Sequence, residues 1–238
     1  MNIPDINCDL GENESGQTRA SLMEIIDSAN ISCGVHAGNA SSIHHSIELA
    51  LANQVRIGAH PGLYGEGGRG KTFPKTGDFI NLLDEQVLPF REMVGKVGGI
   101  LHHIKLHGTL YHATDQVPEL AEVFLNWCNR NLAGVRIYAR SGGATSRLAR
   151  KNQIPCWEEC FLDRAYESDG SLRARNFADA MIEDLSSLED RLEHWRDSGN
   201  LVTLDGNNLP LTCQTFCLHS DHPKVVEFAK VTRRFFPR

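Results

Sequence analysis

Short apolar runs alternate with amphipathic stretches along the whole chain, and this alternation restricts the fold more than any other feature. Each apolar run ends near a turn that contains glycine or histidine, and the stretch after it has apolar residues at helical spacing. Repeated strand–helix units build a parallel sheet that is covered by helices. The expected strands are residues 3–8, 28–33, 55–59, 99–105, 135–139, 155–161, 201–204 and 215–218. The expected helices are residues 41–53, 78–97, 118–130, 144–151, 187–198 and 223–235.

Seven or eight such units fit a closed or nearly closed β/α barrel. No stretch has the composition of a linker, so we expect residues 1–238 to form a single α/β domain. An open doubly wound sheet is the alternative, because periodicity does not show whether a sheet closes. Ser41 is expected to cap a helix, Pro118 to lie in a first turn, and Gly199 to end a helix.

The charge balance narrows the class of partner. The chain has 24 Lys and Arg against 30 Asp and Glu, a net charge of −6, which argues against binding to nucleic-acid phosphates. No apolar run approaches the ~20 residues of a membrane span, and the N-terminal residues lack the features of a signal peptide. We therefore expect a cytoplasmic protein that acts on a small molecule.

Charged side chains and histidines follow most of the expected strands. They are Asp9, Glu12, His36, His60, Lys105, His107, Asp163, Glu167, His219 and Asp221. In a parallel β/α architecture the carboxyl ends of the strands share one face, so these residues are expected to converge on one pocket. Such a set can hold a divalent metal with an open position for water, or it can supply a general acid and base. The residues alone leave both possibilities open.

Three local features add candidates. Lys105 ends an apolar strand, where its ammonium can stabilise an oxyanion. In residues 163–170, Asp163 and Arg164 can pair, and Tyr166 offers a ring beside a carboxylate. Residues 65–72, GEGGRGKT, match the phosphate-loop pattern, but the sequence around them is not strand–loop–helix. We favour a glycine-rich lid in which Arg69 or Lys71 reaches an anionic substrate.

Six sequence blocks, taken together, resemble a known family. They are NCDLGE (7–12), SANISCGVHAGN (28–39), GAHPG (58–62), HIKLHGTLY (103–111), FLDRAYESDGSL (161–172) and CLHSD (217–221). These blocks are similar to the LamB/YcsF family, in the same order and over nearly the whole chain. Each member of that family is one subunit of a 5-oxoprolinase. The resemblance implies a seven-stranded β/α barrel related to glycoside hydrolases and polysaccharide deacetylases. The chain departs from the family pattern in loops over the expected pocket, for example at Asn39, Leu106 and Ser220.

The activity implied by the resemblance is the ATP-dependent opening of the lactam of 5-oxoproline (pyroglutamate) to glutamate, with two partner subunits. The implied catalytic residues are Asp9, Glu12, His60, Lys105, His107 and Asp163. The expected substrate-binding residues are His36, Arg69, Arg164, Tyr166, His219 and Asp221. Of these, His36, Arg164 and His219 lie at positions of the family's motifs, whereas Arg69, Tyr166 and Asp221 are candidates from the local sequence alone. Water activation is expected from Asp9 or a histidine and charge stabilisation from Lys105, so Asp9→Ala and Lys105→Ala should abolish turnover with little loss of stability.

Two alternatives remain at this stage. One is a metal-dependent carbohydrate deacetylase or hydrolase, with Asp9, His36 and His60 as the metal ligands. The other is a non-catalytic subunit that binds a small anion.

Overall fold

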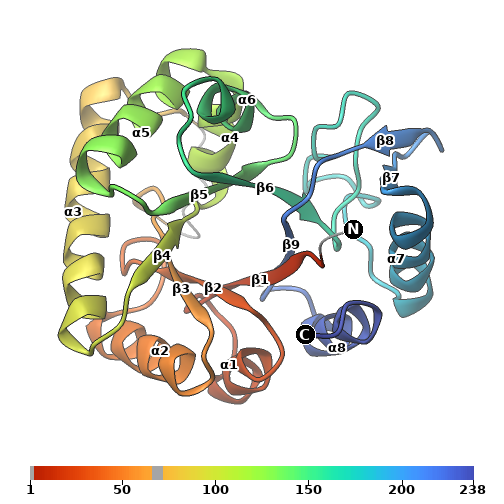
Figure 1. Cartoon of the computed structure of the whole chain (residues 1–238), viewed down its shortest axis with the longest axis horizontal. Helices are drawn as coiled ribbons and strands as arrows, with labels where there is room; N and C mark the ends of the chain where they lie inside the picture. The colour runs from red at the N-terminus through yellow and green to blue at the C-terminus, as the bar shows by residue number, and fades with distance from the viewer. Residues whose placement is uncertain (1–2, 66–71) are drawn as a thin grey trace.

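Seven parallel strands close into a barrel in the computed structural model, which describes residues 3–65 and 72–238 (Figure 1). Their order around the barrel is β1-β2-β3-β4-β5-β6-β9, and β9 pairs with both β1 and β6. They are β1 (Asp5–Leu10), β2 (Ser28–Ser32), β3 (Arg56–His60), β4 (Leu101–Ile104), β5 (Arg136–Arg140), β6 (Cys156–Phe161) and β9 (Thr215–His219). The predicted barrel is confirmed, and the open-sheet alternative is wrong because the last strand closes the sheet.

Helices surround this ring of strands (Figure 1). In the described residues they are α1 (Gly16–Met23), α2 (Ala40–Ala52), α3 (Thr76–Lys96), α4 (Gly108–Gln116), α5 (Pro118–Asn131), α6 (Ala144–Lys151), α7 (Leu185–Ser198) and α8 (Val225–Phe235). Pro118 begins α5, and Gly199 follows α7 in the left-handed conformation, both as predicted. Within residues 3–65 and 72–238, none of the helices combines the length and the apolar character that a membrane crossing needs.

The structure corrects three details of the sequence prediction. The strand expected at 201–204 is not part of the barrel, because β7 (Asn200–Val202) pairs antiparallel with β8 (Asn208–Pro210) in a separate two-stranded sheet. The sequence prediction lacks the helices α1 and α4, because both are short and follow directly on the turns after strands. The cap of α2 is Asn39 rather than Ser41, since the Asn39 side chain accepts from two backbone N–H groups of the first turn.

Polar residues at every second position of β1 fill the barrel interior. Asp5, Asn7 and Asp9 bond side chains from other strands across the barrel, whereas Ile6 and the other alternate residues belong to the apolar core. The opposing strands contribute further buried polar side chains, namely Ser28, Asn30, His103, Glu159 and Thr215. Side chains alternate in direction along a strand, so the barrel centre is a hydrogen-bonded network instead of the usual apolar layers.

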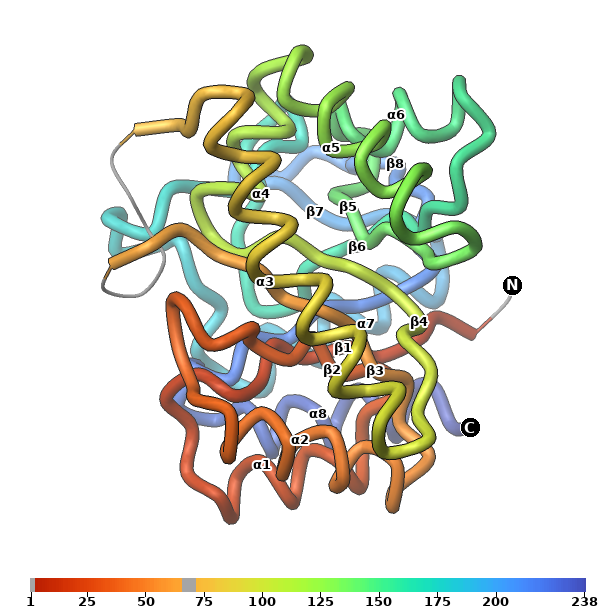
Figure 2. The backbone as a smooth tube through the Cα atoms, turned by 90° about the vertical axis from the view of Figure 1, so that its left-hand side faces the viewer, coloured from red at the N-terminus to blue at the C-terminus, as the bar shows by residue number. Residues whose placement is uncertain are grey.

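The two mouths of the barrel differ in chemistry. Both chain termini lie on the right in Figure 2, where the strands begin, and the cyan loop after β6 lies on the left. At the first mouth Asp5 accepts from Ser28, Thr215 and Arg56, yet burial outweighs these bonds and raises the pKa of Asp5 to about 6. At the second mouth, where the strands end, the predicted functional residues gather.

Candidate active site

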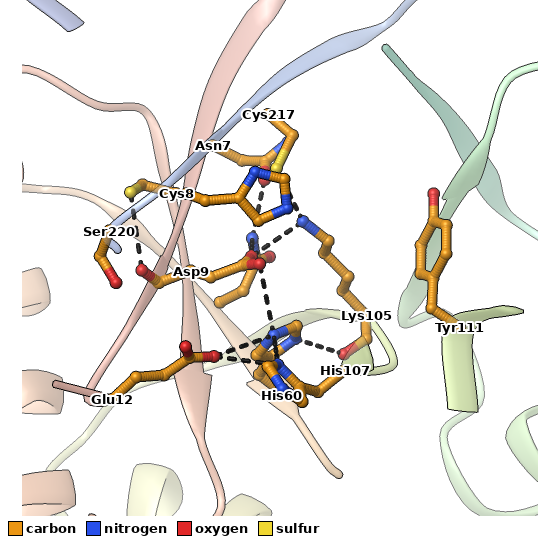
Figure 3. A network of polar contacts seen from close by, with 12 residues as sticks. Asn7, Cys8, Asp9, Glu12, His60, Lys105, His107, Tyr111, Cys217 and Ser220 are labelled. Carbon is orange, nitrogen blue, oxygen red and sulfur yellow. Dashed lines mark hydrogen bonds and ion pairs between the residues drawn. The ribbon is translucent and has the colours of Figure 1, made fainter. Parts of the chain in front are cut away.

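A buried ion pair between Asp9 and Lys105 forms the centre of the site. Asp9 lies near the end of β1, and Lys105 directly follows β4. Lys105 Nζ lies 2.8 Å from Asp9 Oδ1 and 2.9 Å from Cys217 Sγ (Figure 3). It also lies 3.0 Å from Glu159 Oε1. All three N–H groups of the ammonium therefore have an acceptor within reach.

This arrangement fixes the charges at the barrel centre. Burial lowers the pKa of Lys105, but the nearby carboxylates of Asp9 and Glu159 outweigh it and raise the pKa well above its ordinary value. Burial raises the pKa of Asp9, but His60 and Lys105 hold it well below its usual range. Asp9 is thus a stable carboxylate and a weak base. Lys105 is a cation that orients Asp9.

A directed chain of hydrogen bonds also holds Asp9. Asn30 Nδ2 donates to Asp9 Oδ1 at 2.8 Å, and the side-chain oxygen of Asn30, Oδ1, lies 2.7 Å from His103 Nε2. Because that oxygen can only accept, His103 carries its proton on Nε2. The ring fits because residue 58 is glycine: a Cβ there would lie 2.0 Å from His103 Nε2. Asp9 Oδ2 is left without a bond to Lys105 or Asn30.

Glu12, His36, His60 and His107, here called the histidine cluster, meet beside Asp9. Each comes from a different strand end or the loop after it, as predicted. The rings of His36 and His107 stack with centroids 4.1 Å apart, and His60 Nε2 lies 3.4 Å from Asp9 Oδ2. Burial lowers the pKa of His36 to about 4. Burial raises the pKa of Glu12, but the contacts with His107 and His36 outweigh it and lower the pKa.

Asp163 and His219 form a second pair at the same mouth. Both carboxylate oxygens of Asp163 lie 3.0 Å from His219 Nδ1, and the His219 backbone N–H donates to Asp163 Oδ2 at 2.8 Å. Burial opposes ionisation of Asp163, but His219 prevails and lowers its pKa to about 2. The ionised carboxylate holds a proton on Nδ1, so Nε2 is the nitrogen that His219 offers to the pocket.

A cavity of about 420 Å³ opens over these residues. Asp9, Lys105 and His219 form its floor and walls together with His60, His107 and Tyr111. Its other walls come from α4 and from the loop after β6, including Arg164, Arg173 and Arg175. Arg164 is buried, with its guanidinium bound to backbone carbonyls of Ala180 and Arg173. A small anionic molecule fits a pocket of this volume and charge.

Five of the predicted catalytic and substrate-binding residues that the structure describes do not line this cavity, namely Glu12, His36, Asp163, Tyr166 and Asp221. The Tyr166 hydroxyl is buried and accepts from the backbone N–H of Phe161, so the ring supports the end of β6. Asp221 forms an ion pair with Arg175 at 2.6 Å, and Arg175 lines the pocket. Arg69 lies outside the described residues. His36 is in the histidine cluster but not among the residues that line the cavity.

Sequence reasoning missed the polar residues inside the strands. Glu159 binds Lys105 and also accepts from Tyr111 at 3.0 Å and from Asn7 at 2.8 Å. His103, which the sequence alone suggests is a packing residue, positions Asn30. The sequence does contain a signal for these residues: polar side chains recur at every second position in otherwise apolar strands, as expected for side chains that face the barrel interior.

The chain is similar to known proteins over nearly its whole length. The model of the LamB/YcsF family matches residues 4–237. A 5-oxoprolinase subunit of Heliobacterium modesticaldum is 34% identical over 235 residues, which are 96% of this chain and 92% of that protein. The protein of the same name from Shouchella clausii is 33% identical, with 97% of this chain and 93% of that protein covered.

A solved structure shares the architecture as well. The lactam utilization protein from Thermus thermophilus superposes with a TM-score of 0.88 at 27% identity, and the match covers 98% of this chain and 95% of that chain. The match thus extends over nearly the whole chain. The chain belongs to the LamB/YcsF family.

Proposed function

We propose that this chain is a component of a 5-oxoprolinase and opens the lactam of 5-oxoproline to give glutamate. Family membership and the names of its relatives support this activity. The observation that carries the proposal is one small cavity lined by the ionised Asp9–Lys105 pair and by His219, which the buried Asp163 orients. Such an arrangement supplies a fixed carboxylate and a proton carrier, which hydrolysis of an amide requires.

His219 is the proton carrier in this proposal. Its Nε2 takes a proton from water, the water oxygen bonds to the lactam carbonyl carbon, and the carbon–nitrogen bond breaks. The same proton then passes from Nε2 to the leaving nitrogen, so that glutamate forms without net proton loss at His219. Asp9 is too weak a base for this role because its pKa is held low. Its Oδ2, which Lys105 and Asn30 leave unbonded and which lies 3.4 Å from His60 Nε2, is placed to accept from the lactam N–H.

The cationic side of the cavity has a matching role. Arg173 and Arg175 come from the loop after β6 and line the mouth, where they can attract the substrate carboxylate. Lys105 keeps Asp9 ionised and is a positioning residue, since its three N–H groups are occupied. This differs from the oxyanion role expected from the sequence.

ATP use is assigned to the partner subunits. A phosphate-binding loop leads straight into a helix. Residues 65–72 match its sequence pattern, but α3 begins only at Thr76, beyond Pro74. Use of ATP and the need for partner subunits are proposals that rest on the family resemblance. The domain boundaries 1–238 and the cytoplasmic location stay predictions.

Glutamate release from 5-oxoproline tests the proposal, with the chain alone and combined with candidate partner subunits, with and without ATP. We expect ATP-dependent glutamate only in the mixture. His219→Gln and Asp9→Asn should lower kcat by about 10²- to 10⁴-fold, whereas His45→Gln, on the exposed side of α2, should leave it unchanged. If partners that are active with a relative of this chain yield no glutamate with this chain, the proposal is wrong. The deacetylase and the non-catalytic binding protein would then be the alternatives to test.

A further inference from the structure

We propose that the histidine cluster binds one divalent transition-metal ion of the zinc class. The ligand atoms are Glu12 Oε1, His36 Nε2, His60 Nε2 and His107 Nδ1. This inference does not rest on lactam opening, because it concerns what the four side chains can hold.

The spacing of the four atoms is that of metal ligands. Glu12 Oε1 lies 2.9 Å from His107 Nδ1, 3.5 Å from His36 Nε2 and 3.6 Å from His60 Nε2. His107 Nδ1 lies 3.0 Å from His60 Nε2. In a tetrahedral site with metal–ligand distances of about 2.0–2.1 Å, two ligands are about 3.4 Å apart. The observed separations lie on both sides of that value.

Unsatisfied buried atoms point to the same conclusion. Glu12 Oε1 and both ring nitrogens of His36 are buried, and none of them makes a well-aligned hydrogen bond to the described residues, although Glu12 Oε1 lies 2.9 Å from His107 Nδ1. Burying a polar atom without a partner costs about 1–3 kcal/mol, so several such atoms in one place require an explanation. His36 is seated there by Gly62, where a Cβ would lie 2.5 Å from His36 Nδ1. A bound ion would satisfy Glu12 Oε1 and His36 Nε2 together.

The tautomer of His60 is already set for coordination. His60 Nδ1 lies 2.8 Å from the backbone carbonyl oxygen of Lys105, which can only accept. The carbonyl therefore holds a proton on Nδ1, so the neutral ring that binds a metal carries its lone pair on Nε2, which faces the cluster. Metal-binding histidines are characteristically oriented in this way by a carbonyl or carboxylate on the other nitrogen.

The donor set selects the class of ion. Three imidazoles and one carboxylate suit Zn²⁺ and neighbouring first-row ions, whereas Mg²⁺ and Ca²⁺ prefer sites made of oxygen ligands. Asp9, one of the three ligands expected from the sequence, is replaced by Glu12 in this set. Asp9 Oδ1 is already neutralised by Lys105, 2.8 Å away.

A second group, Asp9, Cys217 and His219, is also compact but carries no metal proposal. Lys105 Nζ contacts both Asp9 Oδ1 and Cys217 Sγ, so a positive charge already lies between these two atoms. His219 is bound to Asp163 through Nδ1. A divalent ion there would face the lysine at close range, which is unfavourable.

The test measures binding of the ion itself. The full chain is stripped with a chelator and dialysed against Zn²⁺, Co²⁺ or Mg²⁺, and the bound metal is counted by elemental analysis. We expect about one Zn²⁺ or Co²⁺ per chain, a higher melting temperature, and a Co²⁺ visible spectrum typical of tetrahedral coordination. Mg²⁺ should do none of these. Because the readouts need no substrate, failure of this inference is separate from failure of the lactam activity.

Matched variants locate the ion. His36→Gln and Glu12→Gln should each weaken Zn²⁺ binding by about 100-fold or more, because each removes a ligand. His112→Gln is the control, since His112 lines the same cavity but is not part of the cluster. Circular dichroism checks that each variant folds, and the two ligand variants give independent results. The inference is overturned if the stripped chain takes up no Zn²⁺ or Co²⁺, if Mg²⁺ is preferred, or if both folded ligand variants bind as the control does.

Discussion

Replacing Lys105 with methionine should destabilise the protein strongly. Methionine fills much of the same space but leaves Asp9 and Glu159, both buried, without the ammonium that lies 2.8 and 3.0 Å from them. Breaking a buried ion pair by removing one partner costs about 3–5 kcal/mol. For a chain of this size that loss lowers the melting temperature by about 6–20 °C. The expectation from sequence that Lys105→Ala would leave stability nearly intact does not fit this geometry.

Urea unfolding followed by tryptophan fluorescence measures this loss. Lys96→Met is the control, because Lys96 pairs with Glu92 on the surface of α3 and such pairs contribute about 0–1 kcal/mol. If uncompensated charge is the cause, Lys105→Met with Glu159→Gln should be more stable than Lys105→Met alone, by about 1 kcal/mol or more. A loss below about 1 kcal/mol for Lys105→Met, or no recovery in the double variant, would refute the reasoning.

Two further predictions concern the rest of the barrel interior. Gly58→Ala should cost about 1–3 kcal/mol by overpacking, since its Cβ would meet His103 Nε2 at 2.0 Å; it should lower kcat more than it changes KM, and unchanged stability and kcat would contradict the role of His103. The pKa of Asp5 is about 6 in the folded protein and about 4 in the unfolded chain. The protonated carboxyl group therefore favours folding most at pH 4 or below. About 3 kcal/mol of that contribution to the free energy of unfolding is lost as the pH rises through 6. The free energy of unfolding of Asp5→Asn relative to the wild type should therefore increase from pH 4 to pH 7, and a flat difference would show that the charge of Arg56 keeps Asp5 ionised.

The barrel and the location of the site follow from local sequence patterns. Strand–helix alternation determines a parallel sheet, and the carboxyl ends of its strands must share a face, so Asp9, His60 and His219 can be placed together from their positions alone. Closure was less certain from periodicity, because it depends on the pairing of β1 with β9. These strands lie at opposite ends of the sequence, and no local signal reports their pairing.

The roles of the individual site residues could not be read in the same way, because they depend on contacts across the barrel. Asp9 and Glu12 are three positions apart and look equally suited to bind a metal. Lys105 distinguishes them, although it is 96 residues from Asp9 in the sequence. By neutralising Asp9 it leaves Glu12 as the carboxylate with a buried oxygen still unsatisfied. The ammonium of Lys105 therefore has two effects. It stabilises the fold, and it separates Asp9, an orienting carboxylate, from the histidine cluster that binds the metal. Lys105→Met should thus alter the metal selectivity of the site as well as the stability of the protein.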